Sequence, residues 1–194
     1  MKDGLFITGT DTGVGKTRIA AALLKAGAQA GLAMAPMKPI ASGAEFFDVG
    51  DGRRELRNDD ALALLEAAGG RFDYAAVNPY CFEPAISPHI AAMDAGVTVD
   101  PARLGAAARN LATKCDWLVV EGAGGALVPV TRNTTFADVF AWWNLPVVIV
   151  ARTGLGTINH ALRTIEALRT RRVPIHGVAF VGDVNADSEA TICA

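Results

Sequence analysis

The stretch that decides the fold is Gly9-Thr10-Asp11-Thr12-Gly13-Val14-Gly15-Lys16-Thr17, which follows the apolar run Leu5-Phe6-Ile7 and precedes a segment of helical character. Its small residues allow successive backbone N–H groups to surround phosphate oxygens, and the start of the helix adds the positive end of its dipole. In such a loop Lys16 reaches the β- and γ-phosphates, and the Thr17 hydroxyl ligates Mg²⁺. The stretch therefore predicts a phosphate-binding loop.

This loop is a variant of the usual pattern, in which four residues separate the first glycine from the Gly-Lys pair. Here Thr10 occupies the position of that glycine, and Gly9 lies one place earlier. A glycine-rich turn that binds no ligand would also explain the glycines. The strand before the loop, the helix after it and the Gly-Lys-Thr core together favour a nucleotide.

Length and composition favour one soluble domain spanning residues 1–194. A chain of 194 residues with 51% hydrophobic residues can bury a single good core. The 18 basic and 20 acidic residues nearly balance, so neither nucleic acid nor a membrane surface is an expected partner. The three cysteines have no metal-ligand spacing, no leader segment precedes the first strand, and no apolar run approaches a membrane span, which together predict a cytoplasmic protein.

Short apolar runs alternate with longer segments of helical period, which is typical of a parallel sheet covered on both faces. The predicted class is α/β, a three-layer P-loop NTPase-like fold. Residues 43–57 contain three glycines and mixed charges without period, and they are predicted to form a mobile loop. The expected strands are 5–8, 33–38, 117–121, 146–151 and 175–181, and the expected helices are 17–30, 58–68 with Asn58 as N-cap, 101–114 after Asp100, and 157–171.

A carboxylate ends the apolar run Trp117-Leu118-Val119-Val120-Glu121. The carboxyl ends of the strands line the ligand crevice in a doubly wound sheet, so Glu121 is a candidate to face the same Mg²⁺ as Thr17. A solvent-exposed glutamate after a strand is the plain alternative. The glycine-rich segment 122–125 supports the metal role, because it allows a ligand to approach the backbone closely.

Other polar candidates follow the second expected strand. Lys38 ends that strand, Ser42 lies in the next loop, and a lysine there can neutralise charge on a transferred phosphoryl group. A surface lysine at a strand end is the alternative. Asp59 and Asp60 are equally consistent with a role at the site and with ordinary acids that the helix dipole favours in a first turn. Their spacing alone does not decide between the two interpretations.

The motifs in order give a specific resemblance. They are residues 9–17, Lys38-Pro39-Ile40-Ala41-Ser42-Gly43, Arg57-Asn58-Asp59-Asp60-Ala61-Leu62, Val77-Asn78-Pro79-Tyr80, Ser87-Pro88-His89 and Glu121-Gly122-Ala123-Gly124-Gly125. Over nearly its whole length the chain resembles the dethiobiotin synthetase family. The phosphate loop and the last motif are shared with wider ATP-binding relatives, whereas the others are more specific.

The resemblance implies an ATP- and Mg²⁺-dependent ligase that joins 7,8-diaminononanoate and CO₂ (bicarbonate) into dethiobiotin, through a carbamate and a carbamic-phosphoric anhydride. It implies that Lys16 and Lys38 are catalytic and that Thr17, Asp60 and Glu121 serve Mg²⁺. Nucleotide contacts are implied for Thr12, Gly13, Val14, Gly15, Lys16, Thr17, Asp60, Glu121, Gly122, Ala123, Gly124, Gly182 and Asp183, and substrate contacts for Thr12, Lys38, Ser42, Pro79, Tyr80, Gly124 and Asn159.

One of these assignments has another reading from the residues alone. Tyr80 would otherwise be assigned to packing after a turn at Pro79, and His89 is expected to be structural. The segment 154–160 predicts a helix N-terminus with the geometry of an anion site. In the family this element resembles the one that receives the substrate carboxylate from the neighbouring subunit, which implies a homodimer.

The sequence departs from the family near its end. The family usually has Asn-Asp in place of Gly182-Asp183, and that asparagine contacts the adenine edge. Family members also continue past the position of Ala194 through a strand and a helix that complete the base pocket, so either the protein is natively short or part of it is absent.

A second class shares the expected fold, namely the ATPase switches of the partitioning type (ParA/MinD-like), which act by dimerising and binding a partner. Those proteins carry an additional lysine early in the phosphate loop, where this chain has Thr10. That difference favours the synthetase.

Overall fold

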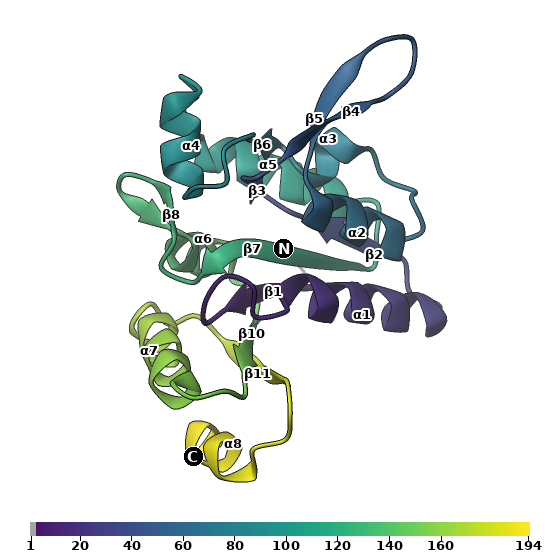
Figure 1. Ribbon diagram of the computed structural model, residues 1–194. Coiled ribbons are helices and arrows are strands. Elements are labelled where there is room, and N and C mark those ends of the chain that lie inside the picture. The colour runs from purple at the N-terminus through teal and green to yellow at the C-terminus, as the bar shows by residue number, and fades with distance from the viewer. Residues whose placement is uncertain (1–2) are drawn as a thin grey trace.

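The computed structural model describes residues 3–194 and contains a five-stranded parallel sheet with the order β11-β10-β1-β7-β2 (Figure 1). β1 lies in the middle, because β10 and β7 pair with its two edges. The carboxyl ends of β1, β7 and β2 therefore meet at one edge of the sheet. The strands are β1 (Gly4–Gly9), β2 (Met34–Met37), β7 (Trp117–Gly125), β10 (Val147–Arg152) and β11 (Ile175–Val181).

Helices cover both faces of this sheet, as the burial of β1 shows. Successive strand residues point to opposite faces, and Phe6 belongs to one apolar cluster whereas Leu5 and Ile7 belong to another. The cluster of Phe6 includes residues of α5, α6 and α7, and that of Ile7 includes residues of α1 and α2. The predicted α/β class is confirmed. The helices are α1 (Lys16–Gln29), α2 (Asp59–Ala67), α5 (Pro101–Ala112), α6 (Phe136–Trp143) and α7 (Thr157–Thr170).

The predicted helix starts at Asn58 and Asp100 are confirmed by their caps. The Asn58 side chain accepts a hydrogen bond from Asp60 N at 3.1 Å, and the Asp100 side chain accepts one from Ala102 N at 2.8 Å. Each cap satisfies a backbone donor that the first turn of a helix leaves unpaired. The first of them fixes the start of α2 beside the carboxyl edge of the sheet.

The prediction of a mobile loop over residues 43–57 is wrong. The segment forms an antiparallel hairpin of β4 (Glu45–Asp48) and β5 (Arg54–Arg57), which projects from the body of the protein (Figure 1). Its tip uses positive φ angles at Gly50, Asp51 and Gly52. β4 is exposed along its whole length, so no buried face imposes the alternation of apolar residues that identifies a strand in a sequence.

One further local expectation is corrected, because the glycine-rich segment Gly122–Gly125 is the end of β7 rather than a loop. Tyr80 follows a bend at Pro79 and begins the short strand β6 (Tyr80–Cys81), which pairs with β3 (Ile40–Ala41). Within residues 3–194 no helix is both long and apolar enough to cross a membrane. The remaining elements are α3 (Tyr74–Val77), α4 (Pro88–Asp94), β8 (Pro129–Thr131), β9 (Thr134–Thr135) and α8 (Ala186–Cys193).

Candidate active site

The phosphate loop joins β1 to α1 at the centre of the carboxyl edge. Gly13 and Gly15 have φ angles of 69° and 101°, which side-chain-bearing residues rarely adopt. Gly15 is the N-cap of α1 and provides no side chain to bond the first N–H groups of the helix, which are thus available to an anion. The Lys16 ammonium donates to the Asp11 carbonyl oxygen at 3.0 Å and so folds back over the loop. Val14 is buried in the core and offers the loop only its backbone.

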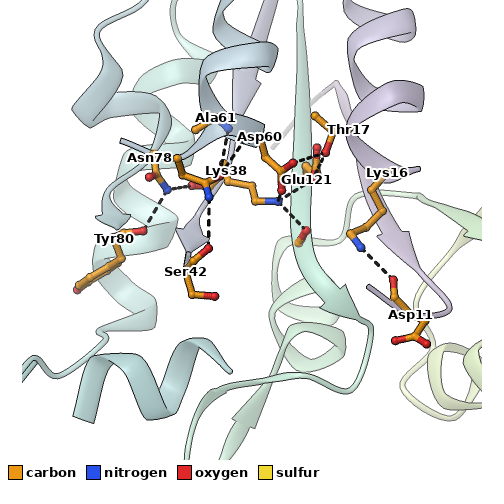
Figure 2. A network of polar contacts seen from close by, with 12 residues as sticks. Asp11, Lys16, Thr17, Lys38, Ser42, Asp60, Ala61, Asn78, Tyr80 and Glu121 are labelled. Carbon is orange, nitrogen blue, oxygen red and sulfur yellow. Dashed lines mark hydrogen bonds and ion pairs between the residues drawn. The ribbon is translucent and has the colours of Figure 1, made fainter. Parts of the chain in front are cut away.

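The buried Lys38 lies at the centre of a charge cluster (Figure 2). It follows β2, and its ammonium contacts Glu121 Oε1 at 2.6 Å, Asp60 Oδ2 at 2.7 Å and the Gly122 carbonyl oxygen at 3.4 Å. Glu121 comes from β7 and Asp60 from the first turn of α2. Three elements that are distant in sequence thus place one cation between two carboxylates.

Thr17 joins the same cluster from the start of α1. Its hydroxyl lies 2.8 Å from Asp60 Oδ1 and 3.0 Å from Glu121 Oε1. A hydroxyl has one proton, so it donates to one carboxylate at a time and keeps lone pairs for another ligand. The second oxygen of the buried Glu121, Oε2, has no hydrogen-bond partner within residues 3–194. An oxygen without a partner beside a second carboxylate and a hydroxyl forms a set of hard oxygen donors that suits Mg²⁺.

No group of three or more histidine, cysteine, aspartate and glutamate side chains gathers in the described chain in a way that could hold a metal by itself. A metal bound at Thr17, Asp60 and Glu121 would therefore need oxygens from a ligand or from water to complete its coordination. This is how Mg²⁺ is usually held beside substrate phosphates.

The pKa values of the cluster follow from its charges. Burial alone would lower the pKa of the Lys38 ammonium, but Glu121 and Asp60 outweigh burial, so this pKa is raised. Burial would raise the pKa of Asp60, whereas Lys38 and the Thr17 hydrogen bond lower it, and the net shift is downward. Burial and the nearby Lys38 lower the pKa of Lys16. Lys38 therefore stays protonated and Asp60 ionised at neutral pH.

The cluster opens into a cavity of about 740 Å³, which is large enough for a small-molecule ligand. The cavity brings together eleven of the residues predicted from the sequence: Thr12, Gly13, Gly15, Lys16, Thr17, Lys38, Ser42, Asp60, Glu121, Ala123 and Gly124. Gly122 lies next to it and bonds Lys38.

Pro79, Tyr80 and Asn159 do not line this cavity in the described chain. Tyr80 is buried, and its hydroxyl accepts a hydrogen bond from Asp100 N at 3.0 Å, so its visible role is packing. Asn159 is exposed on α7. Substrate contacts by these three residues stay predictions. His89 contacts Ser87 Oγ through Nδ1 at 2.9 Å, within α4 and its N-cap.

Gly182 and Asp183 line a second cavity of about 480 Å³, on the side of the phosphate loop toward α7. Gly182 has a φ of 131°, and a Cβ added there would collide with the Thr153 hydroxyl oxygen. The backbone at this position therefore disfavours asparagine, the residue that the family resemblance leads us to expect here. Glycine fits because it tolerates this φ angle and has no Cβ to contact Thr153.

Gly182→Asn is accordingly expected to lower the free energy of unfolding by about 1–3 kcal/mol, the usual cost of a strained backbone position. Gly154→Asn is the matched control, because a Cβ there meets no atom within 4 Å, and it should change stability by less than about 0.5 kcal/mol. Urea denaturation measures both. Equal stabilities of the two variants would contradict the strain.

The sequence gives no signal for three cavity residues, namely Ala85, Ile86 and Val128. Asn58 is predicted as a helix cap and belongs to the motif 57–62, but its place in the cavity is not predicted. Ser87 and Pro88 also line the cavity, and the Ser-Pro-His motif was the signal that could have assigned them. Ile86 and Val128 add apolar surface to the lining of the cavity, which suits a ligand with an aliphatic part.

The phosphate loop between the central strand and its helix defines this chain as a nucleotide-binding protein of the P-loop class. A family model described as an AAA domain matches residues 3–194. A ParA family ATPase from Chlorobium tepidum aligns over 100% of this chain and 82% of its own, with a TM-score of 0.52 and 18% identity. The kinase domain of the Escherichia coli tyrosine kinase ETK aligns with a TM-score of 0.54 over 96% and 71%, at 18% identity. At such identities these likenesses show the fold alone.

Curated relatives identify the family. An ATP-dependent dethiobiotin synthetase BioD from Novosphingobium aromaticivorans is 57% identical over 97% of this chain and 81% of its own. Proteins of the same name from Anaeromyxobacter dehalogenans and Rhodopseudomonas palustris are 47% and 45% identical, over 91% and 99% of this chain and 75% and 81% of their own. The chain belongs to the dethiobiotin synthetase family, which consists of ATP-dependent ligases.

Proposed function

We propose that this chain closes 7,8-diaminononanoate and CO₂ into dethiobiotin at the expense of ATP. The observation that carries the proposal is the convergence of Lys16, Thr17, Lys38, Asp60 and Glu121 on one cavity that also has apolar lining residues. Such a cavity can hold phosphates next to an aliphatic diamine. Membership of a family of dethiobiotin synthetases supports this particular pair of substrates.

The proposed chemistry balances in three steps. One amine of the diamine adds to CO₂ and loses a proton, which gives a carbamate. A carbamate oxygen then attacks the γ-phosphorus of ATP and displaces ADP, which gives a carbamic-phosphoric anhydride. The second amine attacks the carbonyl carbon and expels phosphate, and loss of its proton leaves the cyclic urea. The protein must therefore align the carbamate with the γ-phosphate and neutralise charge, rather than form a covalent bond itself.

The phosphate loop serves the nucleotide in this proposal. The N–H groups of Gly13, Val14, Gly15 and Lys16 surround the phosphates, and the Lys16 side chain turns from Asp11 toward the β- and γ-oxygens. Thr12, Ala123 and Gly124, which also line the cavity, contact the phosphates and the carbamate, and Gly122 lies beside them. Gly182 and Asp183 contact the base or ribose from the second cavity, where Gly182 offers no side chain to read it.

Thr17, Asp60 and Glu121 would hold Mg²⁺, in accord with their oxygen donors and the unpartnered Glu121 Oε2. The ion supplies charge neutralisation to the phosphates when it is bound. Lys38 then moves its ammonium from the two carboxylates toward the carbamate and the transferred phosphoryl group. Ser42 orients the diamine or its carbamate from the loop that follows β3.

The remaining assignments concern a homodimer. Asn159 and the N-terminus of α7 would receive the substrate carboxylate from the neighbouring subunit, since backbone N–H groups at a helix start favour an anion. Pro79 and Tyr80 would shape the substrate site through β6, which is paired to β3 next to Ser42. These roles extend the proposal beyond the main cavity.

Mass detection of dethiobiotin after incubation with diamine, bicarbonate and MgATP tests the proposed function directly. We expect product and phosphate to form in equal amounts and only when all three substrates are present. Phosphate release without diamine, or a requirement for a macromolecular partner, would instead support an ATPase switch.

The metal role of Asp60 is tested by Asp60→Asn. Loss of a charged oxygen is expected to raise the Mg²⁺ concentration for half-maximal rate by about tenfold. Asp59→Asn is the matched control, because Asp59 occupies the same first turn of α2 but is exposed and lies outside the cluster. Magnesium titrations at saturating ATP compare the two variants. An Asp60→Asn titration that matches wild type would remove this residue from the metal site.

A further inference from the structure

Three buried polar side chains link the segments that carry the site residues Lys38, Ser42 and Asp60. They are Asn78, Tyr74 and Asn58, with exposed fractions of 4%, 9% and 7%. None of the three was assigned a role in the reaction from the sequence. Their hydrogen bonds run continuously from one segment to the next, and Figure 2 shows the part of this network around Asn78 and Lys38.

Asn78 fixes the backbone of Lys38. Its amide nitrogen donates to the Lys38 carbonyl oxygen at 2.6 Å and to the Tyr80 carbonyl oxygen at 3.0 Å. The preceding residue, Val77, accepts a hydrogen bond from Lys38 N at 2.9 Å. Both backbone polar groups of Lys38 are therefore bonded to the segment 77–78. This anchorage sets the point from which the lysine side chain reaches into the cavity.

Tyr74 continues the chain of hydrogen bonds to α2. Its hydroxyl donates to Asn78 Oδ1 at 3.1 Å and accepts from Asn58 N at 2.7 Å. Burial is the main cause that raises the pKa of this phenol far above its ordinary value, so the hydroxyl keeps its proton and remains a donor. The Cys81 sulfur lies 3.6 Å from the same oxygen.

Asn58 hydrogen-bonds to two segments that carry site residues. Its side-chain oxygen accepts from Asp60 N at 3.1 Å and from Ala61 N at 3.4 Å, and its amide nitrogen donates to the Ser42 carbonyl oxygen at 3.3 Å. The same residue thus caps the helix that carries Asp60 and holds the loop that carries Ser42. Buried amides bonded at both ends allow little displacement without leaving a polar group unpaired.

We propose that Asn78 and Tyr74 are positioning residues for the reaction, acting through backbone contacts that set Lys38 relative to Asp60 and Ser42. This inference rests on the proposed function, because it assigns them to the same site. Within residues 3–194, the side chains of Asn78, Tyr74 and Asn58 make no direct hydrogen bond to the phosphate loop, whose Lys16 and Thr17 side chains bond Asp11, Asp60 and Glu121 instead. Phosphoryl transfer and metal binding should therefore depend on the network, whereas nucleotide binding to the loop should not.

Tyr74→Phe tests the proposal, because it removes one hydroxyl and keeps the ring. We expect kcat to fall about tenfold or more, since misplacement of about 1 Å can cost a hundredfold. The dissociation constant of ATP in EDTA should remain within twofold of wild type. In the presence of ADP, the dissociation constant of Mg²⁺ measured by calorimetry should rise at least threefold, because Asp60 is displaced with α2.

The matched control is Thr164→Val, which also removes a buried hydroxyl, one that donates to the His160 carbonyl oxygen at 2.9 Å within α7. It should keep wild-type kcat, ATP affinity and Mg²⁺ affinity. Asn78→Asp provides a second test, because it keeps the acceptor for Tyr74 and loses both donors. If it folds, it should show the same split between kcat and ATP affinity.

The outcomes separate the two proposals. A wild-type chain that makes no dethiobiotin contradicts the proposed function. The Mg²⁺ dissociation constants of wild type and Tyr74→Phe, measured with ADP, still test the positioning role in that case. Equal Mg²⁺ affinities of wild type and Tyr74→Phe contradict that role, as does a kcat within twofold of wild type. A loss of ATP affinity in EDTA as large as the loss of kcat would show a general structural defect and would also overturn it.

Discussion

Lys16→Ala is expected to lower the rate of dethiobiotin formation by about a thousandfold, the upper range for loss of one donor that faces developing charge. Lys16 is the one ammonium of the phosphate loop, and its present partner is only a carbonyl oxygen of that loop. Its removal leaves no buried carboxylate without a counter-ion, so the variant should fold. Single-turnover phosphate release measures the effect.

Lys25→Ala is the control for this experiment, because Lys25 is an exposed lysine on the same helix. It should retain the wild-type rate. Thermal denaturation of both variants verifies that they fold. A Lys16→Ala rate within tenfold of wild type would contradict the assignment of this loop to the triphosphate.

Lys38→Ala is expected to lower kcat by about a hundredfold while ATP affinity changes little, because the ammonium acts mainly on the charge of the transferred phosphoryl group. The structure also predicts a second effect of the substitution, which is tighter binding of Mg²⁺. Without Lys38, the carboxylates of Asp60 and Glu121 lose their bridging cation. Mg²⁺ no longer competes with an ammonium there, so the nucleotide-free variant should bind Mg²⁺ more tightly than wild type.

Steady-state kinetics and calorimetry measure the two effects of Lys38→Ala separately. Loss of one partner of a buried ion pair also destabilises a protein by about 3–5 kcal/mol. The kinetics therefore need to be run with Mg²⁺ present and below the melting temperature. An unchanged kcat with weaker ATP binding would contradict the catalytic role, and weaker Mg²⁺ binding would contradict the competition.

The sequence was sufficient to predict the convergence of Lys16, Thr17, Lys38 and Glu121, because each follows or ends a buried strand of a parallel sheet. Parallel strands place their carboxyl ends at one edge whatever the details of the loops. The assignment of Asp60 to the site rests on the family resemblance, because the helix dipole explains an acid on the first turn of α2 equally well. The structure shows that it lies with the other four.

Other features of the structure have weak or no signals in the local sequence pattern. The hairpin of β4 and β5 has no buried face, so its sequence lacks a strand period. Asn78 and Tyr74 act through contacts with segments 40 and 16 residues away, which no local pattern encodes. The helix α6 is different, because Thr135 and Asp138 form a capping box before an apolar run. This spacing indicates a helix start from the sequence alone, although no helix over 136–143 is among the expected elements.

The ammonium between Asp60 and Glu121 gives the site its own counter-ion before any ligand arrives. In many small metal-binding proteins the ion completes the fold, and a chelator unfolds them. Here the positive charge is covalently part of the chain, at Lys38. The domain is therefore expected to fold without a metal, and the proposed Mg²⁺ ion would act on the chemistry of the site rather than on the fold.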